Sequence, residues 1–111
     1  MKAKQAAQFD DKAKTLAQAA KAIAHPARIA ILQFLLENNN QTCKEIVDQL
    51  PFSQSTVSQH LAELKIGGFI DGKSFKTSMI YSLNQEAITN FRLQFEDIFG
   101  SSKDKRQLSL F

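Results

Sequence analysis

The chain has 111 residues, of which 43% are hydrophobic and 23% are charged, so its size and composition fit one globular domain and not two. Its net charge of +3 at pH 7 is compatible with a polyanionic partner without requiring one. Cys43 is the only cysteine, which excludes an intramolecular disulfide, and no apolar run fits a signal peptide or a membrane span; we therefore expect a cytoplasmic protein without a membrane partner.

The first part of the chain predicts two helices that meet at a proline. Apolar residues at steps of three and four predict a helix over residues 5–24. His25 and Pro26 interrupt this run, and Pro26 suits the first turn of the next helix because its missing N–H is no loss there. We expect His25 to act as a structural cap. The second helix, over 26–39, is apolar over a wide arc, which predicts that it forms the centre of the core.

Two further helices follow at a spacing that indicates a helix-turn-helix. Thr42 and Glu45 form a capping-box pattern, which predicts a short helix over residues 42–50. Ser53 is a favourable N-cap for a fourth helix, which should end at the glycine pair that begins with Gly67. The turn of about four residues between these helices has the spacing of a helix-turn-helix.

The sequence pattern changes after the glycine pair. Phe69–Ile70 and Ser78–Leu83 predict two strands, and the polar stretch DGKSFKT between them predicts a hairpin tip. A last helix is expected over residues 85–99 because its apolar side chains share one side. The predicted fold is mainly α with a small β-hairpin, in the order helix-helix-helix-helix-hairpin-helix, which is a winged helix-turn-helix.

The first and last predicted helices each carry an apolar stripe, although the central unit already has a core. Such stripes are best buried against each other across a two-fold axis, so we expect a homodimer formed through these two helices. The winged domain should occupy residues 1–100, and residues 101–111 should form a flexible tail. The expected dimer contacts are Phe9, Leu16, Ile88, Phe91, Phe95 and Phe99.

The fourth predicted helix has an unusual outward face. Val57, Leu61 and Leu64 recur at helical spacing and should seat the helix on the core. The opposite side is thin and uncharged, whereas a face that is merely solvated, the competing interpretation, is normally filled with charged residues. Short polar side chains suit the major groove, where glutamine can bond adenine at two positions and serine can bond bases or phosphates. The candidate DNA contacts are Gln54, Ser55, Thr56, Ser58 and Gln59.

Three blocks of the sequence, AIAHPARIAILQFLLEN, QSTVSQHLAELKIGGFI and SMIYSL, resemble the ArsR/SmtB family of bacterial repressors. The resemblance runs from about Ala22 to Phe99 and implies a winged helix-turn-helix homodimer that binds operator DNA and releases it on sensing a ligand, often a metal. It places His60 on the recognition helix with the polar residues named above, and Lys73 and Lys76 on the wing. For His60, a phosphate contact and a packed, hydrogen-bonded ring remain alternatives.

Neither of the two metal-ligand sets that are common in this family is present. Zinc and thiophilic metals require several Cys, His or carboxylate groups that converge. By the resemblance, the ligand positions would fall on Thr42 and Lys44, with Cys43 between them, or close to Gln85, Ala87, Ile98 and Ser101. We therefore expect no metal site and no cofactor, and any effector is unidentified.

The resulting prediction is a sequence-specific repressor that binds double-stranded DNA at an inverted repeat and is not an enzyme, since no phosphate loop or catalytic triad pattern occurs. One alternative is a thiol-responsive repressor that uses Cys43, although a lone thiol is more often a small structural residue. A second is a tethering module whose C-terminal QLSLF resembles peptides that dock on the bacterial sliding clamp. The competing interpretation of that peptide is a tail that folds back on the dimer helices; its residues are Gln107, Leu108, Leu110 and Phe111.

Overall fold

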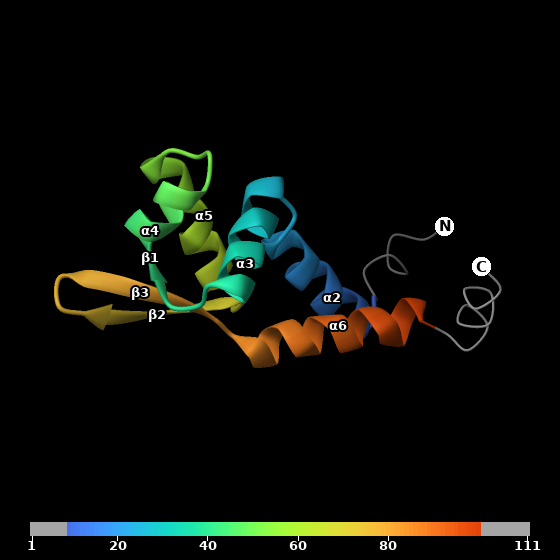
Figure 1. Cartoon of the computed structure of the whole chain (residues 1–111). Helices are drawn as coiled ribbons and strands as arrows, with labels where there is room; N and C mark the ends of the chain where they lie inside the picture. The colour runs from blue at the N-terminus through green and yellow to red at the C-terminus, as the bar shows by residue number, and fades with distance from the viewer. Residues whose placement is uncertain (1–8, 101–111) are drawn as a thin grey trace.

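A computed structural model describes residues 9–100, and its helices surround a core from which a long hairpin projects to one side (Figure 1). The expected order of four helices, a hairpin and a last helix is confirmed, and with it the winged helix-turn-helix architecture. The elements are α2 (Asp11–Ala22), α3 (Pro26–Glu37), β1 (Gln41–Thr42), α4 (Cys43–Gln49), α5 (Gln54–Ile66), β2 (Ile70–Phe75), β3 (Ser78–Leu83) and α6 (Gln85–Phe99).

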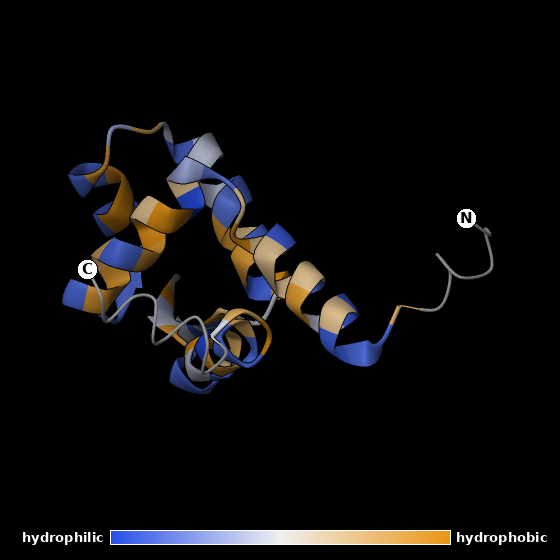
Figure 2. Ribbon diagram, turned by 90° about the vertical axis from the view of Figure 1, so that its right-hand side faces the viewer, coloured by the Kyte–Doolittle hydropathy of each residue, from blue (hydrophilic) through white to orange (hydrophobic). Residues whose placement is uncertain are grey.

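The core lies between α3, α4, α5 and the base of the hairpin. Ile31 and Leu35 of α3, Ile46 of α4 and Leu61 of α5 are fully buried there. Each such aliphatic side chain contributes roughly 1.5–3 kcal/mol when it is removed from water. Figure 2 shows apolar residues where these helices face one another and hydrophilic residues on their outer turns. The prediction that the helix after Pro26 forms the centre of the core is confirmed.

The first helix begins later than predicted within the described residues. Phe9 precedes the helix, and Asp10 caps it by accepting a hydrogen bond from the Ala13 N–H at 2.8 Å. Apolar spacing extends across Asp10, but an aspartate that accepts from the first turn favours an extended backbone and ends the helix there. The chain then turns before α3, where His25 Nδ1 accepts from the Ala27 N–H at 3.0 Å, so the expected cap is confirmed.

The sheet has three strands, in the order β1-β3-β2, rather than the two that were predicted. Gln41 and Thr42 of β1 pair antiparallel with Tyr81 and Ile80 of β3. A strand of two residues is too short to show any alternation of apolar and polar residues, so it leaves no signal in the sequence. Its pairing fixes the start of α4 against the hairpin.

The first strand of the hairpin is longer than predicted. β2 continues through most of the segment expected to be the tip, and Phe75 still pairs with Ser78 of β3. Only Lys76 and Thr77 form the turn, with Lys76 at φ 57°. The prediction failed because the outer part of β2 is exposed on both faces and therefore lacks the alternation that marks a half-buried strand.

The last helix packs against α2 at the side opposite the hairpin tip (Figure 1). Leu16 of α2 is buried there, and Lys12 forms an exposed ion pair with Asp97 of α6 at 3.0 Å. The aromatic rings of Phe91, Phe95 and Phe99 follow one another along α6, with centroids 6.5 Å and 4.9 Å apart. Several large apolar side chains at this end remain exposed: Phe9, Leu93, Phe95, Ile98 and Phe99.

No single helix within residues 9–100 has both the length and the apolar composition to cross a membrane; α2 and α3 pass that test only as a pair, bent by 86° between them. The N-terminal part of the predicted first helix and the tail over 101–111, including the QLSLF peptide, lie outside the described residues.

Candidate nucleic-acid interface

The turn between α4 and α5 has the length expected of a helix-turn-helix. α4 ends at Gln49, α5 begins at Gln54, and the chain between them comprises residues 50–53. The capping box predicted at the start of α4 is present, since the Thr42 hydroxyl accepts from the Glu45 N–H at 3.1 Å and the Glu45 carboxylate accepts from the Thr42 N–H at 2.8 Å. Both helix starts are therefore fixed by their own side chains.

A cluster of hydroxyl groups covers the first turn of α5. The Ser53 hydroxyl accepts from the Thr56 N–H at 3.3 Å and donates to the Thr56 hydroxyl at 2.9 Å. The Ser55 hydroxyl lies 3.3 Å from that of Ser53. This N-terminal end of the helix carries the positive end of the helix dipole, which favours a nearby phosphate.

The outward face of α5 is formed by the polar residues that the sequence identified. Gln54, Ser55, Ser58 and Gln59 are all exposed, and Thr56 is partly buried at the edge of the face. Residues three and four positions apart are neighbours on a helix, so these side chains form one continuous surface. The opposite side is buried in the core through Val57, His60, Leu61 and Leu64.

His60 belongs to the inner face of α5 and not to this outward surface. Its side chain is 9% exposed, and its Nδ1 accepts a hydrogen bond from Arg28 Nε at 3.1 Å. The structure therefore decides in favour of the packed, hydrogen-bonded ring, and we remove His60 from the candidate DNA contacts. The sequence left the choice open because His60 lies at the border of the apolar stripe.

A second imidazole lies against the first. The His25 and His60 rings are tilted by 45° with centroids 4.4 Å apart. Burial lowers the pKa of His60 below its usual value of 6.5, and the neighbouring His25 and Arg28 lower it further, while Glu63 opposes them. Because Nδ1 accepts from Arg28, the neutral form of His60 carries its proton on Nε2.

Arg28 is the residue of this region that the sequence analysis missed. Its Nη1 donates to the carbonyl oxygen of Ala22 at 3.0 Å while its Nε donates to His60, so one side chain connects the end of α2 with α5. An arginine within an otherwise apolar helix is the signal that could have identified it, since such a charge normally has a specific partner.

The wing carries the two lysines that the resemblance placed there. Lys73 on β2 and Lys76 in the turn are both exposed, and neither forms an ion pair with a carboxylate of residues 9–100. The Lys76 ammonium lies 5.4 Å from the ring centroid of Phe75, which is also exposed. These residues lie in the outer part of the hairpin, whose tip projects away from the helices (Figure 1).

Comparison with known proteins decides the family. The model described as "Bacterial regulatory protein, arsR family" matches residues 25–71. An uncharacterized HTH-type transcriptional regulator of Methanocaldococcus jannaschii is 31% identical over 78 residues, which cover 70% of this chain and 88% of that protein. The chain belongs to the ArsR family. This confirms the resemblance to the ArsR/SmtB family.

Two further transcriptional regulators are similar to this chain over more than half of its length. The HTH-type transcriptional regulator YgaV of Escherichia coli is 29% identical over 93 residues, or 84% of this chain and 94% of its own. The HTH-type transcriptional repressor SmtB of Mycobacterium tuberculosis is 42% identical over 64 residues, or 57% of this chain and 46% of its own. These proteins are regulators, and the present ArsR-family chain is a DNA-binding transcriptional regulator and not an enzyme.

Solved structures agree with the fold. An ArsR-like transcriptional regulator from Rhodococcus sp. RHA1 superposes with a TM-score of 0.73 at 21% identity, covering 91% of this chain and 93% of that one. A homodimeric winged helix-turn-helix DNA-binding domain from Mycobacterium bovis gives a TM-score of 0.65 at 27% identity, covering 78% and 82%.

Two of the positions that the resemblance gives for metal ligands have other roles here. Thr42 belongs to the capping box, and Lys44 forms an exposed ion pair with Asp48 at 3.5 Å. Cys43 is partly buried at the start of α4, beside Tyr81, whose pKa is raised by burial and, to a smaller extent, by Cys43. Within residues 9–100, no three His, Cys, Asp or Glu side chains converge to hold a metal ion.

Proposed function

We propose that the protein is a homodimeric repressor that binds an inverted-repeat operator, with one α5 in each of two major grooves. The observation that carries this proposal is the exposed, uncharged face at the start of α5, opposite the buried side that seats the helix. The relation to the repressor SmtB favours repression, in which the bound dimer blocks access of the polymerase to a promoter.

Base recognition is assigned to the glutamines and serines of this face. Gln54 and Gln59 can each bond the N6 and N7 edge of an adenine, and Ser55 and Ser58 are short enough to let the helix approach the bases. Thr56, whose hydroxyl is already bonded to Ser53, is assigned to the backbone edge of the interface. These contacts decide which sequence is bound.

Affinity without sequence preference is assigned to the wing and to the helix end. Lys73 and Lys76 are exposed cations, and neutralising phosphates releases condensed counterions. The amides of the first turn of α5 can add one phosphate contact at the positive end of the helix dipole.

Dimerisation is assigned to α6 together with the start of α2. Phe95 and Phe99 of α6 and Phe9 before α2 expose half or more of their surface, which is unusual for aromatic rings in a monomer. Leu16, Ile88 and Phe91 pack mainly within their own chain and would support the interface from beneath. The homodimeric domain from Mycobacterium bovis favours this assembly.

The test is binding of the purified protein to genomic DNA fragments, beginning with the fragment upstream of its own gene. We expect a protected inverted repeat, and the Gln59→Ala variant should lose about 1–3 kcal/mol of discrimination against a changed base at one symmetric position. Gln85→Ala, an exposed glutamine on α6, is the matched control and should bind as the wild type does. Unchanged sequence preference of the Gln54→Ala and Gln59→Ala variants would refute the assigned face.

A reporter gene placed behind the bound fragment tests the direction of regulation. Deleting the regulator should raise expression if it represses. Lower expression after deletion would identify an activator and contradict the repressor part of the proposal only.

A further inference from the structure

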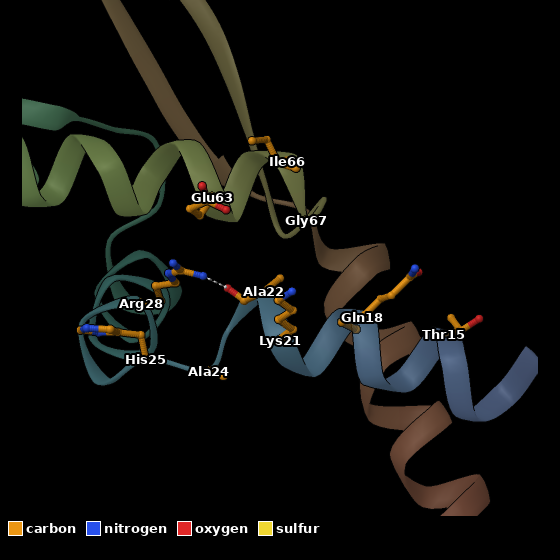
Figure 3. A pocket seen from close by; sticks show the side chains of 11 residues that line it. Thr15, Gln18, Lys21, Ala22, Ala24, His25, Arg28, Glu63, Ile66 and Gly67 are labelled. Carbon is orange, nitrogen blue, oxygen red and sulfur yellow. Dashed lines mark hydrogen bonds between the residues drawn. The ribbon is translucent and has the colours of Figure 1, made fainter. Parts of the chain in front are cut away.

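A pocket of about 690 Å³ lies on the side of the molecule where α2, the connection to α3 and the last turns of α5 meet (Figure 3). Its size falls within the range of small-molecule sites, roughly 300–1,000 Å³. Its lining comes from three separate elements that the Arg28 hydrogen bonds join. Neither the DNA contacts nor the dimer contacts assigned above belong to it.

Positive charge dominates one part of the lining. Arg28 and Lys21 both line the pocket, and neither forms an ion pair with a carboxylate of the described chain. Arg28 donates to His60 and to Ala22, but the remaining N–H groups of its guanidinium have no acceptor within residues 9–100. Glu63 is the single carboxylate in the lining, so a carboxylate-bearing ligand would find more cations than anions there.

The rest of the lining includes an apolar surface. Ile66, at the end of α5, is 80% exposed, more than any other large apolar side chain of the described residues. Ala19, Ala22 and Ala24 are the other apolar side chains of the lining and come from α2 and the connection to α3. In Figure 3, Ile66 and Glu63 come from α5 above, whereas Ala22 and Arg28 come from the elements below. A ligand with an apolar body could cover Ile66.

The lining of the pocket is separate from the proposed dimer contacts. It includes no residue of α6, and it includes neither Phe9 nor Leu16. Formation of the proposed dimer through α6 therefore does not require the pocket to close.

We infer that this pocket binds an amphipathic monocarboxylate, with its carboxylate on Arg28 and Lys21 and its apolar body on Ile66. Bidentate hydrogen bonding between a guanidinium and a carboxylate supplies the orientation. The occupant bonds the free N–H groups of the same guanidinium whose Nε holds His60 of α5, so binding alters the support of the recognition helix and lowers DNA affinity. This last step rests on the proposed function.

The first experiment uses the purified wild-type protein without DNA and the probe hexanoate. NMR spectra should show shifts of the Ile66 methyl groups and the Arg28 Nε–H during titration. Hexanamide, which keeps the apolar body and loses the charge, should bind at least about tenfold more weakly, a difference of about 1.4 kcal/mol. Acetate, which lacks the apolar body, should also be weaker. Equal binding of hexanamide, or shifts on α6 instead, would refute the site.

Variants at exposed positions test the same contacts without disturbing the core. Ile66→Ser and Lys21→Gln should each weaken hexanoate binding, whereas Ile29→Ser and Lys14→Gln, exposed residues outside the lining, should bind it as the wild type does. Thermal unfolding without ligand should show that all four fold. A wild-type hexanoate affinity in both pocket variants would overturn the assignment.

A second measurement separates this inference from the proposed function. Hexanoate should raise the Kd for an operator fragment in the wild type but not in the Lys21→Gln variant. If hexanoate binds without changing the Kd for the operator fragment, the regulatory step is refuted but the binding site is not. Failure to bind any DNA would refute the proposed function. The NMR titrations without DNA would still show whether the pocket binds hexanoate.

Discussion

At the scale of single residues, the contact between Arg28 and His60 connects the core helix α3 to the recognition helix α5. The guanidinium donates to Nδ1, so it requires the neutral imidazole, and protonation would place an N–H against another N–H. A second ring, His25, lies against the first, and Glu63 is the nearby acid that opposes the effect. The hydrogen bond between Arg28 and His60 therefore forms only when His60 is neutral.

We expect the stability of the fold to depend on pH through His60. Burial lowers its pKa in the folded state below the unfolded value of 6.5, so folding favours the neutral form. The contribution of neutral His60 to the unfolding free energy should be complete above pH 6.5. It should be lost as the pH falls below 6.5 and through the folded pKa of His60. Urea unfolding of wild type and His60→Gln between pH 7.5 and pH 5 measures this, and equal slopes for both proteins would contradict it.

Close packing of α2 against the end of α5 favours glycine at position 67. A Cβ built at this position would lie 2.5 Å from the Cβ of Ala22. The Gly67→Ala variant should therefore lose about 1–3 kcal/mol of unfolding free energy, because overpacking forces the helices apart. Denaturant unfolding of Gly67→Ala, Ala22→Gly and the double variant checks this. The cycle should show a favourable coupling, and strictly additive losses would exclude the contact as the cause.

At the scale of elements, the wing is a long, exposed hairpin whose base is buried and whose tip is not. Ile70 and Leu83 anchor the two strands in the core, while Lys73, Lys76 and Phe75 extend beyond it. Because the outer strand faces water on both sides, its residues are free to serve binding. In the proposed function, the lysines of the wing contact phosphates and the polar face of α5 reads the bases.

Removing the wing lysines should weaken DNA binding to all sequences alike. For each lost phosphate contact, the slope of log K against log salt should fall by about 0.9. Fluorescence anisotropy with operator and unrelated duplexes, over a range of salt, measures the slope for Lys73→Ala and Lys76→Ala. Lys14→Ala on α2 is the matched control. A loss confined to the operator would instead identify these lysines as base-reading residues.

Lys76 also allows binding to be separated from stability. Its φ of 57° is a left-handed backbone conformation that glycine adopts without strain and other residues rarely adopt. Lys76→Gly should raise the unfolding free energy by about 1 kcal/mol while it lowers DNA affinity. Thermal unfolding and anisotropy on the same preparation check the opposite signs, and parallel losses in both would contradict this account.

At the scale of the whole molecule, the described chain has one well-packed end and one incompletely covered end. The helix-turn-helix and the base of the wing share a continuous core, whereas α6 exposes aromatic rings along its far half. Phe95 is 50% exposed although it contacts Phe91 and Phe99 on either side. In the proposed assembly, a second copy of the chain covers this surface.

The Phe95→Glu variant should therefore be monomeric. A charge placed in a buried apolar interface is strongly unfavourable, while the same charge on an exposed monomer surface costs little. Light scattering after size exclusion measures the mass, and the melting temperature of the wild type should rise with protein concentration. Phe75→Glu on the wing, an aromatic ring of similar exposure, should remain dimeric. A monomeric wild type would refute the proposed assembly.

The sequence by itself determined the elements whose signals are local. Helical spacing located α3 and α5, the capping residues Thr42 and Ser53 marked two helix starts, and the polar run from Gln54 identified the outward face. These features depend on neighbours within a few residues, so periodicity and capping chemistry are sufficient to predict them.

Only the tertiary structure decided the features that depend on residues far apart in the chain. β1 exists because Gln41 and Thr42 reach β3 about forty residues later, and no pattern within two residues can encode that pairing. His60 faces inward because Arg28 of another helix bonds its ring. The pocket beside Ile66 likewise forms where three elements meet, and contacts between distant segments arise only when the chain packs.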